Sequence, residues 1–135
     1  MELKDFYFEE KAQVGERMPI LLPDGTDSGE WLNIMLPNAD AAVKAGRAFL
    51  FAYQAKVQEL KPLEKEGDKT RYAVAMNDAC SDLNRQLAVE IINGWSFKEE
   101  AFSREGVVKL LGQYRNLGNM VADFQAKQRK ALEEK

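Results

Sequence analysis

Few side chains in this sequence are of the types that carry out chemistry, and those few are poorly placed for it. The chain has no histidine and one cysteine, Cys80. A Ser-His-Asp or Cys-His nucleophile and the usual Cys/His zinc site are therefore excluded. Cys80 borders an apolar helical stripe with only Arg85 as a nearby cation, which favours a buried structural thiol over a reactive one.

Three acids in one loop, Asp24, Asp27 and Glu30, carry the oxygen ligands that a hard cation prefers. Their spacing is not that of a calcium loop, and Asp24-Gly25 is a turn signal, so a simple turn is favoured. The glycines form neither a phosphate-binding loop nor a dinucleotide fingerprint. We therefore predict no enzyme activity, no cofactor and no metal site.

The most distinctive segment, NGWSFKEEAFSREGVVKLL over residues 93–111, contains three large aromatic residues and no catalytic group. Trp95, Phe97 and Phe102 precede a helix start, and the favoured interpretation is a plug that fills the gap between helix pairs. The alternative is a set of partner-binding anchors, because Trp and Phe dominate the energetics of many interfaces. A plug with one exposed edge would do both. Phe124, in the last helix, is the fourth candidate for this junction.

Composition and charge narrow the class of protein further. A chain of 135 residues with 45% hydrophobic and 30% charged residues fits one domain, residues 1–135. The net charge of −3 offers no basic stripe for nucleic acid. Residues 1–30 hold eight acids and three bases, net −5, so residues 31–135 sum to +2. This asymmetry could favour head-to-tail self-association, although a solvated acidic face is the more ordinary explanation.

The sequence predicts neither export nor membrane insertion. The longest apolar-rich stretch, residues 41–57, is interrupted by Lys44, Arg47 and Lys56, so no membrane span is expected. A lone cysteine cannot form an internal disulfide, and no basic start precedes an apolar run. We expect a soluble protein of the cytoplasm.

The first 37 residues read as an arm followed by a β-hairpin. Residues 1–15 include the cluster Phe6-Tyr7-Phe8 and could form an edge strand or a docking arm. Strands are predicted at residues 17–22 and 30–36, with a turn cluster over residues 23–29.

A helical body is predicted over residues 38–132. Asn38 is the expected N-cap of a helix over residues 39–61, and Pro62 with the polar run that follows should form a mobile linker to residue 69. The inward stripe expected for this helix is Val43, Ala45, Ala48, Phe49, Ala52, Tyr53 and Val57.

The second long helix is expected over residues 70–92, closed by a cap at Asn93-Gly94. Ser103 should cap a short helix, and a last helix is expected over residues 113–132, with residues 125–135 as a polar, solvated tail. The predicted fold is mainly α: a small N-terminal β-hairpin followed by about four helices, of which the two long ones pair antiparallel.

One stretch resembles a known family. Trp95-Ser-Phe97, then Glu100-Ala-Phe102-Ser103 and Glu105, then a short apolar helix and Phe124, resemble the C-terminal half of tail assembly chaperones from long-tailed bacteriophages, in the short, non-frameshifted form. The order of an acidic N-terminus and a hairpin ahead of helices is also similar. The likeness covers residues 30–130 in layout and residues 93–124 in motif.

The resemblance implies a protein that is not an enzyme. Such chaperones bind the tape measure protein and keep it soluble in the host cytoplasm, self-associate into rings or spirals, and are absent from the mature virion. A longer frameshifted form is thought to recruit tail tube protein. Two other classes stay open: a small structural or adaptor protein retained in a phage particle or other complex, and a small regulatory helical domain.

Overall fold

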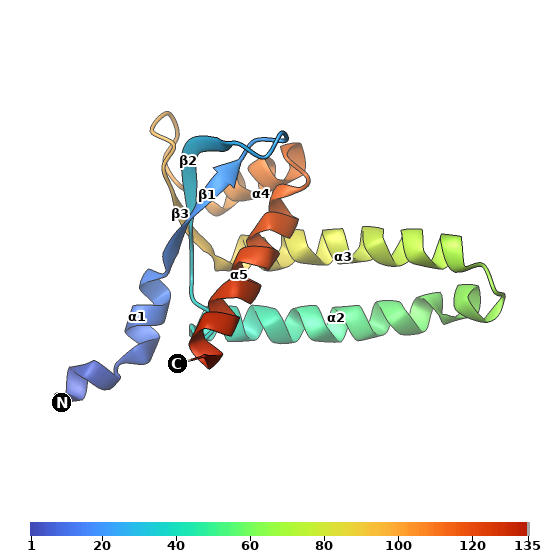
Figure 1. The fold of residues 1–135 in the computed structure, drawn as a ribbon, viewed down its shortest axis with the longest axis horizontal. Coiled ribbons are helices and arrows are strands. Elements are labelled where there is room, and N and C mark those ends of the chain that lie inside the picture. The colour runs from blue at the N-terminus through green and yellow to red at the C-terminus, as the bar shows by residue number, and fades with distance from the viewer. Residues whose placement is uncertain (135) are drawn as a thin grey trace.

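A small antiparallel sheet joins helices that leave it in different directions (Figure 1). The computed structural model describes residues 1–134. In chain order the elements are the 3-10 helix η1 (Leu3–Phe6), α1 (Phe8–Val14), β1 (Glu16–Leu21), β2 (Asp27–Ile34), α2 (Asp40–Lys65), α3 (Lys69–Ile91), β3 (Ile92–Trp95), α4 (Arg104–Gln113) and α5 (Leu117–Glu133). The predicted fold class is confirmed, including the β-hairpin and the antiparallel pairing of α2 with α3. None of the helices in this described part combines the length and apolarity that crossing a membrane requires.

β1 and β2 form the predicted N-terminal hairpin. Their inward side chains alternate along each strand, with Met18 and Ile20 on β1 and Leu32 and Ile34 on β2 all at most 5% exposed. This two-residue period is what one buried sheet face requires. The loop spans residues 22–26, so β2 begins at Asp27 and not at residue 30 as predicted, whereas β1 ends one residue before the predicted end.

The third strand, β3, corrects the prediction that Asn93 and Gly94 form a helix cap. α3 ends at Ile91 as expected, but the chain then continues in extended conformation, and Gly94 pairs with Asn33 of β2. Gly94 is not among the glycines with positive φ, which the predicted cap would need. A local cap signal cannot reveal that a strand partner lies 60 residues earlier in the chain.

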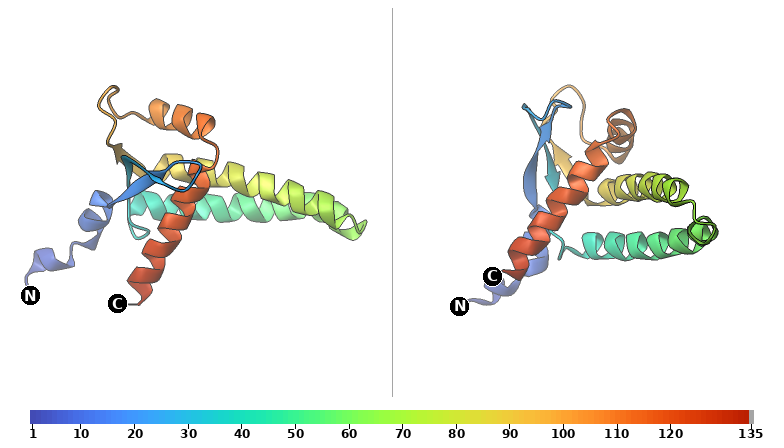
Figure 2. Two further views of the ribbon diagram at one scale, coloured as in Figure 1. Left: turned by 45° about the horizontal axis from the view of Figure 1, so that its top comes forward. Right: turned by 45° about the vertical axis from the view of Figure 1, so that its right-hand side comes forward.

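α2 and α3 project from the sheet as a long hairpin (Figures 1 and 2). Its outer half has no buried residue, because the buried residues nearest the tip are Ala45 on α2 and Ala79 near the middle of α3. The predicted linker over residues 62–69 is wrong: α2 continues through Pro62 to Lys65, and only a tight turn follows. Pro62 lies in the last turn of α2, where its missing amide removes a single intrahelical hydrogen bond.

The predicted inward stripe of α2 is only partly correct. Val43 and Tyr53, which were assigned to it, are each 37% exposed, and Ala48 is exposed as well. Leu50 and Phe51 are 52% and 70% exposed. α2 therefore carries a second apolar surface in addition to the one that packs on α3. We call Val43, Leu50 and Phe51 the outer face of α2.

Residues 1–14 form a helical arm that points away from the hairpin (Figures 1 and 2). The edge-strand alternative for this segment is wrong. Its exposed apolar side chains are Met1, Leu3, Phe6, Tyr7, Phe8 and Val14. Only Ala12 of the arm is buried.

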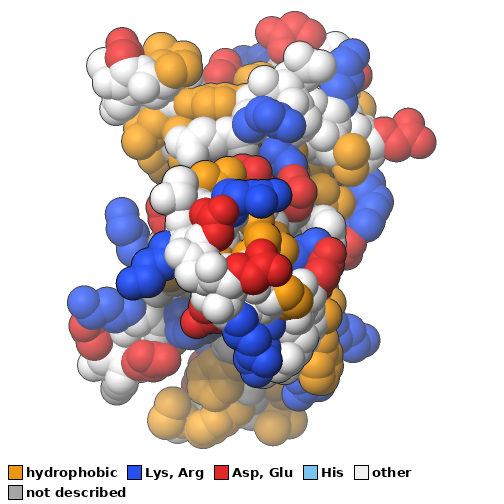
Figure 3. Space-filling view, turned by 90° about the vertical axis from the view of Figure 1, so that its right-hand side faces the viewer, with side chains coloured by type: hydrophobic (Ala, Val, Ile, Leu, Met, Phe, Trp, Pro, Cys, Tyr) orange, Lys and Arg blue, Asp and Glu red, His pale blue; other side chains and the backbone are white. Residues whose placement is uncertain are grey.

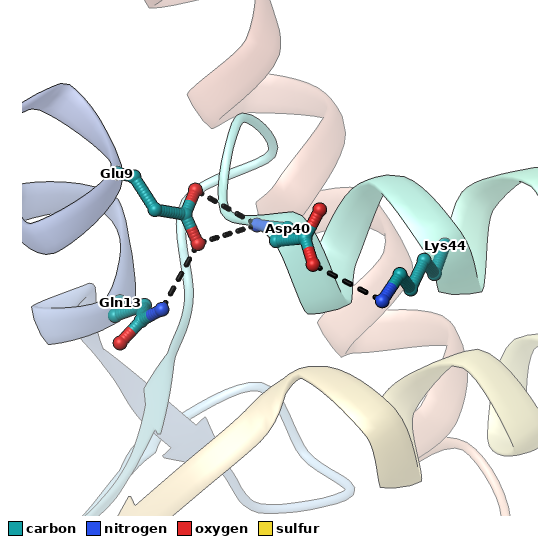
Figure 4. Close-up of polar contacts among 4 residues, drawn as sticks. All are labelled: Glu9, Gln13, Asp40 and Lys44. Atoms are coloured by element: carbon teal, nitrogen blue, oxygen red, sulfur yellow. Dashed lines mark hydrogen bonds and ion pairs between the residues drawn. The ribbon is translucent and has the colours of Figure 1, made fainter.

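Glu9 of the arm caps the N-terminus of α2 (Figure 4). The Asp40 amide donates to both carboxylate oxygens of Glu9, at 2.8 and 2.9 Å, and the Gln13 side-chain amide donates to Glu9 at 2.9 Å. A carboxylate suits this position because the helix N-terminus carries unpaired amides and partial positive charge. The predicted cap, Asn38, is therefore wrong: the cap comes from a residue 31 positions away.

Two asparagines complete the attachment of the arm. The Asn33 side-chain amide donates to the Val14 carbonyl at 2.6 Å and to the Asn93 side-chain oxygen at 2.7 Å. The Asn93 side-chain amide donates to the Gln13 carbonyl at 2.6 Å. We call Glu9, Asn33 and Asn93, with the backbone groups that they bind, the polar clasp. It joins the arm to the sheet and to the base of the hairpin.

The C-terminal helices lie over the base of the hairpin. Ser103 caps α4 as predicted, its hydroxyl accepting from the Gly106 amide at 3.0 Å. α5 approaches α3 closely, since a Cβ at Gly118 would lie 2.8 Å from the Arg85 side chain. The predicted solvated tail over residues 125–135 is wrong in its first half: Gln125 and Gln128 are 4% and 5% exposed. Its last residue, 135, lies outside the described residues.

The polar clasp yields a first prediction. Replacing Glu9 with alanine should lower the free energy of unfolding by about 1 kcal/mol, because the first turn of α2 loses its cap. Urea unfolding followed by circular dichroism measures this. Glu10→Ala is the matched control, since Glu10 is exposed on the same helix. Equal midpoints for the two variants would contradict the capping role.

Gln128 yields a second prediction. Neither of its side-chain amide atoms has a hydrogen-bond partner among the described residues, although both are buried. Gln128→Met keeps the shape and removes the unpaired polar group, so it should stabilise the protein by about 1–2 kcal/mol. Gln125→Met is the control, because the Gln125 amide donates to the Met35 carbonyl and its loss should not stabilise. A lower melting temperature for Gln128→Met would contradict this assignment.

Candidate functional site: the aromatic junction

Three of the four candidate residues meet in the segment between β3 and α4. The rings of Phe97 and Phe102 both contact the Trp95 ring edge to face, with centroid distances of 5.5 and 5.4 Å and interplanar angles of 79° and 82°. The indole Nε1 of Trp95 donates to the Glu100 carbonyl at 3.1 Å. Edge-to-face contacts of this kind hold aromatic rings in defined positions. We call this cluster of three rings the aromatic junction.

Local structure explains where the Trp95 ring lies. β3 places Trp95 opposite Leu32, which is on the buried side of the sheet. The ring then lies against the first turn of α4, where a Cβ on Gly106 would come within 2.5 Å of it. Ser103 fixes the start of that turn through its cap. In the motif WSF…FS.EG, Trp95 supplies the ring and Ser103 caps the helix. Gly106 lacks a side chain and so lets the ring lie against the first turn of α4.

The junction is half-buried and opens to solvent on one side. Trp95 and Phe97 pack against the hydrophobic core, whereas Phe102 is 40% exposed. A hollow of about 340 Å³ adjoins them, lined by Trp95, Phe97, Glu99, Glu100, Gly106, Lys109, Leu110 and Gln113. An apolar floor with a charged rim can receive one apolar side chain of a protein partner. The plug and the partner anchor are thus compatible at this site.

The structure separates Phe124 from the junction. Phe124 lies on α5 beside β1, in a second hollow of about 230 Å³ that shares no lining residue with the first. Near that hollow, the Tyr114 hydroxyl donates to the Leu21 carbonyl at 2.6 Å and fastens the β-hairpin to the C-terminal helices. Phe124 also packs against the hydrophobic core, so its ring contributes to the packing of the fold.

A larger groove between α3 and α4 carries four charged side chains that pair with one another. Arg104 pairs with Glu90 across the two helices, and Arg85 pairs with Asp82 along α3. The Arg104 guanidinium lowers the pKa of the Glu90 carboxyl through a hydrogen bond, more than partial burial raises it. Because each charge already has an opposite partner, this groove offers no net charge for a small ionic ligand.

No arrangement of catalytic or metal-ligating groups lies near the junction. Within residues 1–134, His, Cys, Asp and Glu side chains do not gather in groups of three that could hold a metal ion. Cys80 is a free thiol of intermediate burial on α3. What the junction can do is bind apolar side chains.

Sequence reasoning missed one exposed apolar surface, the outer face of α2. The available signal was that Leu50 and Phe51 fall outside the inward stripe of an otherwise amphipathic helix. A helix that is apolar on a second face has a second partner or an exposed surface. The aromatic arm was recognised as a cluster, but its helical form and its attachment depend on long-range contacts.

Comparison of the chain with protein-family models, with curated proteins and with solved structures finds no match in any of the three.

The aromatic junction yields a third prediction. Trp95→Ala should lower the free energy of unfolding by about 3 kcal/mol, because the ring is lost from between β3 and α4 and leaves a cavity. Phe102→Ala is the control, since its ring is 40% exposed and its loss should cost clearly less. Thermal melting of both variants measures the difference. An unchanged melting curve for Trp95→Ala would overturn this account of the junction.

Proposed function

We propose that this chain is a non-enzymatic phage tail assembly chaperone that self-associates and binds the tape measure protein, keeping it soluble while the tail is built. The observation that carries the proposal is the open aromatic junction at the capped start of α4, with an apolar floor and an exposed Phe102. The motif that forms this junction, from Trp95 to Glu105, is also the one that resembles the chaperone family.

The physical requirements of keeping a tape measure protein soluble support this proposal. A tape measure chain is long and largely helical, and its apolar seams aggregate unless they are covered. One hollow that takes one apolar side chain binds weakly, so coverage requires many copies acting together. A chain that self-associates supplies such repeated sites. In this proposal the protein works in the host cytoplasm and leaves before the virion matures.

Co-expression tests the proposal directly. The product of the longest open reading frame next to this gene should be insoluble alone, and soluble and bound when co-expressed with this protein. Phe102→Ala should reduce the recovered partner several-fold while leaving the circular dichroism spectrum unchanged, because the ring is 40% exposed and packs on Trp95, which lines the hollow. Val108→Ala is a suitable control, since Val108 is 52% exposed on α4 and lines the separate groove between α3 and α4.

A partner that neither binds the wild-type protein nor gains solubility would contradict the proposal. Purified particles provide the second readout. A chaperone leaves the assembly, so detection of the chain in mature particles would favour the adaptor class instead.

A further inference from the structure

The arm presents an apolar surface that its own chain does not use. Phe6 and Phe8 are 54% and 56% exposed and contact each other edge to face, with ring centroids 6.2 Å apart. The arm is held by the polar clasp and by Ala12, not by burial of these rings. The rings are therefore displayed on a fixed support, which lowers the entropic cost of binding.

A second unused apolar surface is the outer face of α2, where Val43, Leu50 and Phe51 follow helical spacing. It lies along the side of the hairpin and not at its tip. Figure 3 looks along the hairpin from its tip, and there Lys and Arg side chains intermix with Asp and Glu side chains. Apolar docking at the tip is thus disfavoured, and the side of α2 is the available surface.

The charges around the two surfaces are complementary. The arm, residues 1–14, carries four acids and two bases, net −2, whereas α2 carries five bases and three acids, net +2. Between Val43 and Phe51 the only charged residues are the bases Lys44, which pairs with Asp40 at 3.1 Å, and Arg47. On the arm, Lys11 is occupied, because its ammonium donates to the Asp5 carbonyl and lies over the Phe8 ring. Complementary charge of this kind sets which surfaces meet.

The two surfaces cannot meet within one chain. The polar clasp fixes α1 at the N-terminus of α2, and the arm points away from the hairpin in each view (Figures 1 and 2). We propose that the arm of one copy docks on the outer face of α2 of a second copy, with Phe6 and Phe8 against Leu50 and Phe51 and Glu10 near Arg47. The inference rests on the self-association included in the proposed function.

This contact joins different surfaces of the two copies, so it is heterologous. Each added copy uses one of its two surfaces to dock and leaves the other free, so the assembly stays open unless a ring closes. A 14-residue arm involves fewer residues than the roughly 20–30 a side of a standard stable interface. Each contact should therefore be weak, and assembly should depend on protein concentration.

A mixing experiment tests the arrangement. Phe8→Ser removes the arm surface and Phe51→Ser removes the outer face; both residues are exposed, so neither change should unfold the chain. Sedimentation velocity over a hundredfold concentration range should show wild-type oligomers and, for each variant alone, association at least tenfold weaker. A mixture of the two variants should form 1:1 dimers that grow no further, because each dimer retains one intact arm-to-α2 contact.

The matched control is Val74→Ser, since Val74 is 57% exposed on α3 and lies outside both surfaces; it should assemble like the wild type. A charge exchange is the second test: Glu10→Arg and Arg47→Glu should each weaken assembly, and the double variant should recover it.

Two outcomes would overturn the inference. If the wild type associates and each single variant associates equally well, a different interface is in use, and the self-association of the proposed function stands. If the wild type stays monomeric throughout, self-association fails as well. Client binding is measured separately by co-expression, so its failure is distinguishable from either result.

Discussion

The polar clasp is the interaction on which the rest of the arrangement depends. Glu9 caps α2, while Asn33 and Asn93 join the arm to β2 and β3. Two backbone bonds reinforce the same place: the Leu36 amide donates to the Ala12 carbonyl and the Met35 amide to the Ile91 carbonyl, both at 2.9 Å. The arm, the sheet and both long helices are thus joined within a few residues of one another, by these hydrogen bonds and by the buried side chains of Ala12, Ile34, Ala42 and Ile91.

This joint allows apolar helix faces to stay exposed to solvent. Because the hydrogen bonds and the hydrophobic core hold the elements together at the base of the hairpin, the apolar faces farther from the core need not be buried for the chain to keep its shape. Burial along α2 stops at Ala45, and Phe51, which is farther from the base, is 70% exposed. Exposed apolar surface on ordered helices is typical of proteins that bind other proteins. The proposed roles of the aromatic junction, the arm and the outer face of α2 all depend on apolar surface that the fold leaves exposed.

Signals that act locally in the sequence predicted the corresponding structure well. Ser103 caps the helix that it precedes, and the alternating residues around Asp24-Gly25 form a hairpin. Features that depend on distant partners were missed. Nothing near Asp40 shows that its amide binds Glu9, and nothing near Gly94 shows that it pairs with β2. The three aromatic rings were found because they lie within eight residues of sequence, whereas the separate position of Phe124 is a matter of tertiary packing.

Hydrogen–deuterium exchange tests the central claim most directly, namely that the aromatic junction is the surface that holds a helical client. Amides of the junction and the start of α4, residues 95–113, should exchange more slowly when the tape measure protein is bound than in the free protein, since a docked side chain closes the hollow beside Trp95. Unchanged exchange over residues 95–113 in a complex that demonstrably forms would contradict the account, because the client would then be held elsewhere.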